Sequence, residues 1–87
     1  MPSGGGSMYN MDTIIGAAWL RSVDRVIDGL GHKKKRDYIQ KIDRSFGDAM
    51  EKFWDSAIEN KIEQKEMYYF ASSFFTGYYE NLLEIEK

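Results

Sequence analysis

Residues 67–83 read MYYFASSFFTGYYENLL, and their apolar side chains recur every three or four positions. That spacing is typical of an amphipathic α-helix, because about 3.6 residues complete one helical turn. We expect this helix to run from about residue 61 to residue 86, with Asn60 and Glu63 forming a capping box at its start. Its predicted inner stripe consists of Met67, Phe70, Ala71, Phe74, Tyr78, Leu82 and Ile85.

The chain shows the same periodicity in two earlier segments. One runs from about Asp12, the expected N-cap, to a stop near Gly29. The other runs from about residue 34 to residue 58, and Gly47 could kink or split it. Its stripe consists of Tyr38, Ile39, Ile42, Phe46, Ala49, Met50, Phe53 and Ala57. Because short connections force neighbouring helices to run antiparallel, the sequence predicts an all-α fold, an up-down-up bundle of three helices.

The length and composition of the chain favour one small domain. It has 87 residues, no cysteine and a single histidine, His32, which excludes disulfides and argues against thiolate or histidine metal sites and catalytic triads. We expect a flexible N-terminus over residues 1–10, followed by a single helical domain over residues 11–87. Residues 1–7 read MPSGGGS, the composition of a linker added for expression, with Met8 as the expected native start.

No targeting signal and no membrane span is recognisable in the sequence. The N-terminus lacks the charged, apolar and small-residue regions of a signal peptide, and polar residues interrupt the longest apolar stretch. We therefore expect a cytoplasmic protein that uses no membrane partner and no cofactor.

Aromatic residues are concentrated in the last predicted helix. Seven of the eleven tyrosines and phenylalanines lie between residues 68 and 79. They either fill a small core, with tyrosine hydroxyls reaching solvent, or form part of a binding surface, since aromatic residues are enriched at interface hot spots. The candidates for protein binding are Trp19, Tyr68, Tyr69, Phe75 and Tyr79.

Charge is distributed unevenly along a chain whose net charge is -2. Residues 32–44 carry six basic and two acidic groups, whereas residues 45–87 carry four basic and nine acidic groups. Such a basic region can be a solvated helix end, a contact for an acidic protein, or a contact for phosphates of nucleic acid. The electrostatic candidates are Arg21 and the residues that we call the basic cluster, which are Lys33, Lys34, Lys35, Arg36, Lys41 and Arg44.

These patterns predict a small non-catalytic protein that binds another protein and regulates or inhibits it by occupying a surface. Regulators from bacteriophages and mobile elements are similar in size, and the analogy rests on size alone. We expect self-association, with a dimer first, because a short chain buries little surface by itself. One alternative is a nucleic-acid-binding accessory protein that uses the basic start of the second helix, and another is a helical bundle that binds a small ligand.

An enzyme is not expected. Carboxylates such as Asp48, Glu63 and Glu66 fall on predicted solvent faces, where they usually serve solubility and ion pairing. Ser72 and Ser73 have no neighbouring base in the sequence, and no glycine-rich phosphate loop is recognisable.

Overall fold

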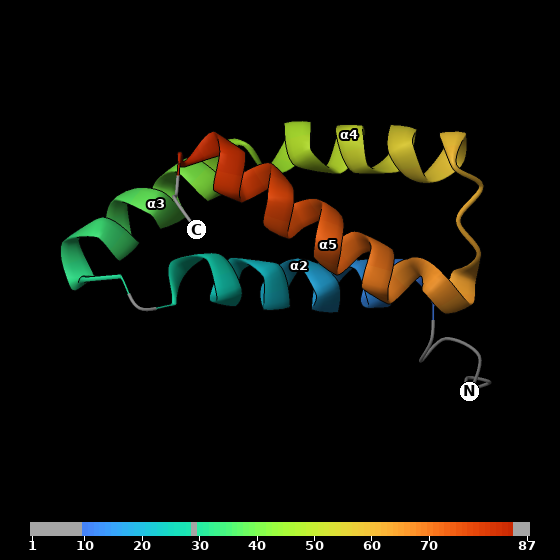
Figure 1. Cartoon of the computed structure of the whole chain (residues 1–87), viewed down its shortest axis with the longest axis horizontal. Coiled ribbons are helices and arrows are strands. Elements are labelled where there is room, and N and C mark those ends of the chain that lie inside the picture. The colour runs from blue at the N-terminus through green and yellow to red at the C-terminus, as the bar shows by residue number, and fades with distance from the viewer. Residues whose placement is uncertain (1–9, 29, 85–87) are drawn as a thin grey trace.

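Four α-helices form the part of the chain that the computed structural model describes, residues 10–28 and 30–84 (Figure 1). They are α2 (Met11–Ile27), α3 (His32–Arg44), α4 (Phe46–Glu59) and α5 (Gln64–Leu82). The predicted all-α class is confirmed. The predicted count of three helices is wrong, because the expected second helix consists of α3 and α4. In Figure 1, α2 and α5 run in the same direction. α4, which lies between them in the sequence, runs in the opposite direction.

The break between α3 and α4 falls at Ser45, two residues before the glycine where a kink was expected. The Ser45 hydroxyl donates a hydrogen bond to the carbonyl oxygen of Ile42 at 3.1 Å, and such back-bonding bends helices. After the bend, the ring of Phe46 meets Trp19 of α2 edge-on, with ring centroids 5.2 Å apart. Gly47 lies inside α4. A local side-chain bond and a tertiary contact therefore accompany the break, while the glycine continues the helix.

The start of α2 also differs from the expected one. Its N-cap is Asn10, whose Oδ1 accepts a hydrogen bond from the backbone N–H of Thr13 at 2.8 Å. Asp12, the predicted cap, lies in the first turn, where its charge suits the positive end of the helix dipole. Gly29, at the predicted stop, lies outside the described residues.

The connection from α4 to α5 does not contain the predicted capping box. The side-chain amide of Asn60 turns back and donates to the carbonyl oxygen of Ser56 at 2.8 Å, so it caps the end of α4. Glu63 precedes α5 as its N-cap, without a side-chain hydrogen bond to the helix. The predicted reciprocal pair between Asn60 and Glu63 is therefore wrong, because the two residues serve different helices.

α4 ends in a Schellman motif. The N–H of Lys61 donates to the carbonyl oxygen of Ile58 at 3.1 Å, and the N–H of Ile62 donates to that of Ala57 at 3.0 Å. Lys61 has a φ of 52°, in the left-handed region that glycine usually occupies. These bonds satisfy carbonyl groups that would otherwise lack partners at the helix end.

The core lies where α5 packs against α2 and α4. Ala18 and Ser22 of α2 and Ala71 of α5 are fully buried, and their small side chains let these two helices approach closely. On the other side of α5, Phe53 of α4 packs against the rings of Phe74 and Phe75, with centroids 5.8 and 5.1 Å away. The buried apolar residues are Ile15, Ala18, Val26, Ile42, Ala49, Phe53, Ala57, Met67, Ala71, Phe75, Tyr79 and Leu83.

This packing rotates α5 relative to the predicted orientation. Its most buried row is Met67, Ala71, Phe75 and Tyr79, continued by Leu83. The expected inner residues Phe70, Phe74 and Tyr78 are only half-buried, and Leu82 is exposed, while Ile85 lies outside the described residues. α2 and α4 cover two sides of α5. The most buried row of α5 therefore lies beside the predicted inner stripe and does not coincide with it.

Candidate binding site

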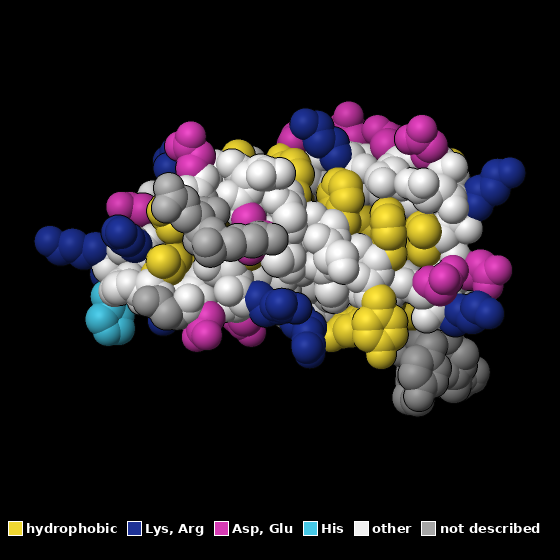
Figure 2. Space-filling model, viewed as in Figure 1, with side chains coloured by type: hydrophobic (Ala, Val, Ile, Leu, Met, Phe, Trp, Pro, Cys, Tyr) yellow, Lys and Arg dark blue, Asp and Glu magenta, His cyan; other side chains and the backbone are white. Residues whose placement is uncertain are grey.

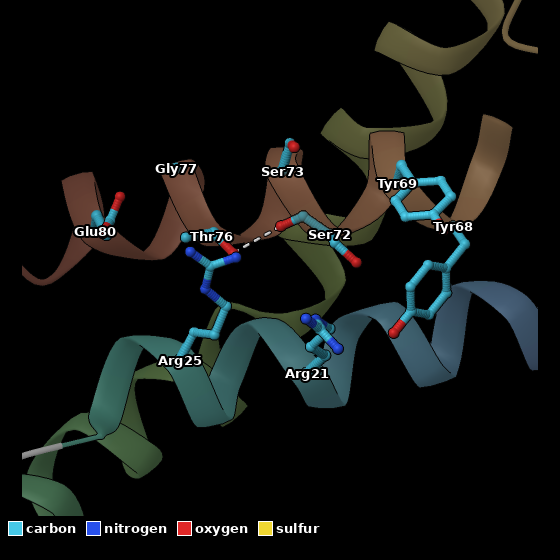
Figure 3. Close-up of a pocket in the computed structure, with 9 residues that line it drawn as sticks. All are labelled: Arg21, Arg25, Tyr68, Tyr69, Ser72, Ser73, Thr76, Gly77 and Glu80. Carbon is cyan, nitrogen blue, oxygen red and sulfur yellow. Dashed lines mark hydrogen bonds between the residues drawn. The ribbon is translucent and has the colours of Figure 1, made fainter.

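A pocket of about 530 Å³ lies between α2 and α5 (Figure 3). We call it the α2–α5 pocket. It combines two arginines from α2 with aromatic, hydroxyl and acidic side chains from α5. The lining residues are Arg21, Arg25, Tyr68, Tyr69, Ser72, Ser73, Thr76, Gly77 and Glu80.

Arg21 and Arg25 stand four residues apart, so they lie on the same face of α2. Figure 3 shows the Arg25 side chain extending towards Thr76 of α5 and the Arg21 side chain one turn earlier on α2. Both residues are exposed, and the structure gives neither guanidinium an ion pair or hydrogen bond with another described residue. Each guanidinium presents a planar fork of N–H donors that can bind a carboxylate with two parallel hydrogen bonds. The pocket therefore has two cations available to a partner.

The hydroxyl groups on α5, across the pocket from the arginines, differ in their hydrogen bonding. The carbonyl oxygen of Ser72 accepts a bond from the Thr76 hydroxyl at 2.7 Å and lies 3.0 Å from the Ser22 hydroxyl. The Ser72 hydroxyl is buried and has no hydrogen-bond partner among the described residues. A buried polar group without a partner costs about 1–3 kcal/mol. Ser72 is thus a polar group in the pocket wall whose hydrogen-bonding capacity is unused.

Two tyrosines form the aromatic end of the pocket. Tyr69 is 74% exposed, whereas Tyr68 is half-buried, and their rings meet edge-on with centroids 5.5 Å apart. Tyrosine offers a large, rigid contact area at a low cost in side-chain entropy. This end of the pocket can therefore supply contact area beside the arginine charges.

The structure brings together three of the predicted site residues, Tyr68, Tyr69 and Arg21, in this pocket. The sequence interpretation overlooked Arg25, although its spacing of four from Arg21 is the signal that could have found it. It also overlooked the buried hydroxyl of Ser72, which no sequence pattern marks.

Phe75 and Tyr79 were wrongly predicted to lie on a binding surface. Both are fully buried in the core, because α2 and α4 enclose the face of α5 that carries them. Trp19 is half-buried, and its Nε1 donates a hydrogen bond to the Tyr79 hydroxyl at 2.7 Å. Burial raises the pKa of Tyr79, and the hydrogen bond from Trp19 opposes that effect. Trp19 and Tyr79 thus join α2 to α5 inside the molecule.

The basic cluster lies apart from the pocket. Its residues belong to α3, at one end of the molecule, where Figure 2 shows Lys and Arg side chains projecting. Lys33, Lys34 and Arg36 are exposed in the first two turns, and the Lys41 ammonium lies 5.8 Å from the centroid of the Tyr38 ring. The predicted electrostatic set therefore separates into Arg21 in the pocket and six residues on α3.

A second, apolar hollow of about 290 Å³ lies between α2 and α4, and we call it the α2–α4 groove. Phe46 and Trp54, which line it, are 42% and 36% exposed, so the predicted inward orientation of Phe46 is wrong. The sequence interpretation did not single out Trp54, although residues 46, 50 and 54 repeat at a spacing of four. The lining residues are Asp12, Ile15, Gly16, Phe46, Met50 and Trp54.

Comparisons of the chain with protein-family models, with curated proteins and with solved structures find no match. Among residues 10–28 and 30–84, no group of three or more His, Cys, Asp or Glu side chains could hold a metal ion. In the same residues, every helix is too short or too polar to cross a membrane.

Proposed function

We propose that this protein binds another protein through the α2–α5 pocket and regulates or inhibits that partner by occupying its surface. The observation that carries the proposal is the strongly exposed ring of Tyr69 in one pocket with two arginines that form no ion pair with another described residue. Tyrosine and arginine are enriched among the residues that dominate binding energy at protein interfaces. Their combination in one pocket supports a contact site.

Binding is proposed in preference to catalysis because the Thr76 hydroxyl, one turn before the only carboxylate in the lining, Glu80, donates to the main chain. The Thr76 hydroxyl donates to a main-chain carbonyl oxygen, and neither a histidine nor a lysine lines the pocket. A nucleophilic hydroxyl needs a base within hydrogen-bond reach.

Affinity capture tests the proposal. The tagged chain is incubated with nuclease-treated lysate of its source cells, beside the Tyr69→Ala variant and the control variant Ile58→Ala. Ile58 on α4 is 71% exposed, close to the value for Tyr69, and it does not line the pocket. We expect a protein partner that the parent chain and Ile58→Ala retain and that Tyr69→Ala loses, with all three chains equally helical by circular dichroism.

Nucleic acid is the second candidate partner, and the exposed lysines and arginine in the first two turns of α3 favour it. In that case capture would depend on intact nucleic acid. It would fail in a variant with Lys33, Lys34 and Arg36 changed to glutamine and survive in Tyr69→Ala. That pattern would overturn the proposal for the α2–α5 pocket.

We also propose that two copies of the chain associate, and the α2–α4 groove supports this part of the proposal. Phe46, Met50 and Trp54 repeat along one side of α4 and present apolar surface to solvent. Large exposed aromatic residues in one groove are typical of interaction surfaces.

A further inference from the structure

We infer that the α2–α5 pocket recognises a carboxylate side chain in an acidic segment of the partner protein. The inference rests on the proposed function and adds the chemistry of the group that the pocket accepts. It follows from the charge of the lining residues, the placement of the two arginines and the unused hydroxyl of Ser72.

The charge of the pocket suits a single carboxylate. Two arginines and one glutamate, Glu80, line it, so the lining carries one net positive charge. A carboxylate brings one negative charge and balances it. A phosphoryl group carries about -1.5 to -2 at neutral pH and would leave excess negative charge beside Glu80.

The geometry of α2 places the two arginines to bind one group together. Residues four apart are separated by about 6 Å along a helix axis, which lets both flexible side chains converge on one carboxylate. Figure 3 shows the guanidinium group of Arg25 reaching α5 beside Thr76, the Arg21 side chain on the same face of α2, and the Ser72 hydroxyl turned towards α2. All three residues line the pocket, and the Ser72 hydroxyl lies buried in its wall.

Ser72 supplies the donor on the opposite wall. The Thr76 hydroxyl already donates its proton to the Ser72 carbonyl oxygen, whereas the Ser72 hydroxyl has no partner. A bound carboxylate has lone pairs enough to accept from a hydroxyl and from both guanidinium groups. Binding would thus satisfy the one buried side-chain polar atom that the described residues leave without a hydrogen bond.

Titration of the isotope-labelled full chain, followed by NMR, tests the inference directly. The probe is an end-blocked peptide of alternating glutamate and alanine, and the matched control replaces each glutamate with glutamine. We expect the glutamate peptide to shift the amide signals of Arg21, Arg25 and Ser72, while the glutamine peptide leaves them unchanged. Shifts confined to the basic cluster on α3, or no shifts, would overturn the inference.

Single substitutions locate the contact. We expect Arg21→Gln and Arg25→Gln each to weaken peptide binding by about tenfold, which is the effect of losing one charge-assisted hydrogen-bonded pair. Arg44→Gln on α3, where the arginine is also exposed, serves as the control and should leave the dissociation constant unchanged. Equal losses in all three variants would show non-specific attraction and contradict a carboxylate site.

Ser72→Ala separates a binding role from a structural one. Because the Ser72 hydroxyl has no partner in the free protein, its removal should leave the melting temperature unchanged or higher. The same change should weaken binding of the glutamate peptide by a few-fold. An unchanged affinity would remove Ser72 from the site.

The arginine variants also separate this inference from the proposed function. If the captured protein is lost with Tyr69→Ala but retained with Arg21→Gln and Arg25→Gln, the partner surface is correct and the carboxylate inference fails. If none of these variants loses the partner, both fail.

Discussion

Trp19 joins three helices through one side chain. Its Nε1 donates to the Tyr79 hydroxyl of α5 at 2.7 Å, while its ring contacts Phe46 of α4 edge-on. The hydroxyl of Tyr79 is therefore the acceptor that allows the indole N–H to lie against the core without a loss of hydrogen bonding.

Replacing Tyr79 with phenylalanine tests this bond. The Tyr79→Phe variant keeps the ring but leaves the Trp19 Nε1 without its acceptor, so we expect the free energy of unfolding to fall by about 1–2 kcal/mol. Urea denaturation followed by circular dichroism measures the change. Tyr69→Phe, at an exposed ring, is the control and should stay within a few tenths of a kcal/mol of the parent. Equal stability of both variants would contradict a role for the bond.

A second residue pair makes the α4–α5 contact depend on pH. The Tyr78 hydroxyl donates to the Asp48 carboxylate, which also forms an ion pair with Lys52 at 3.5 Å. Burial, as the larger cause, and the bond to Asp48 raise the pKa of Tyr78 to about 12. The same bond lowers the pKa of Asp48. The stabilisation from Tyr78 is full below its ordinary pKa of 10.0 and is lost as pH rises through about 12. The stabilisation from Asp48 is present above its ordinary pKa and is lost as pH falls through its lowered pKa.

Ultraviolet titration of phenolate formation checks the pKa of Tyr78. The difference between the parent and Tyr78→Phe should titrate near pH 12. In Asp48→Asn the pKa of Tyr78 should fall towards 10.0 but remain above it, because burial is the larger cause of the shift. A difference curve centred at the ordinary value in the parent would show that neither burial nor the bond to Asp48 raises the pKa of the Tyr78 phenol.

At the scale of single elements, the end of α4 shows strain that glycine would relieve. Lys61 adopts a left-handed conformation that costs a residue with a side chain about 1 kcal/mol relative to glycine. We expect Lys61→Gly to raise the free energy of unfolding by about 0.5–1 kcal/mol, since the greater freedom of glycine in the unfolded chain offsets part of the gain.

Thermal and urea denaturation measure the effect of Lys61→Gly, with Lys61→Ala as the matched control. Alanine removes the charge but keeps the Cβ, so Lys61→Ala should show no such gain. A similar gain in both variants would assign the effect to charge and not to backbone conformation.

Helix boundaries were the part of the elements that the sequence predicted least well. The periodicity located the helical segments of residues 10–28 and 30–84, because the spacing of apolar residues is a local property. It did not locate the break at Ser45, since the apolar spacing continues through it and the break depends on the bond to Ile42 and the contact of Phe46 with α2. Asn60 could cap either neighbouring helix, and the backbone path decided in favour of α4.

At the scale of the whole molecule, charge should control self-association. α4 carries Asp48, Glu51, Asp55 and Glu59 against Lys52, so pairing of two copies through the α2–α4 groove brings like charges together. Salt screens such repulsion. We therefore expect dimer formation to strengthen as salt concentration rises and to be lost in Trp54→Glu.

Sedimentation equilibrium at low and high salt measures this association. Leu82→Glu adds the same charge to α5, away from the groove, at a side chain that is 41% exposed, and serves as the control. A dimer that survives in Trp54→Glu, or one that weakens with salt, would show that the α2–α4 groove is not the contact between copies.

The sequence by itself determined the all-α class, the helical segments and the presence of Arg21, Tyr68 and Tyr69 among the candidate contact residues. These follow from composition and from local apolar spacing. The tertiary structure decided which aromatic residues are buried. Apolar residues cover more of the circumference of α5 than one neighbour can bury, so several rotations fit the pattern, and only packing between α2 and α4 places Phe75 and Tyr79 inside. The same packing brings Ser72 to Arg21 and Arg25, because residues about fifty positions apart meet only when the chain folds.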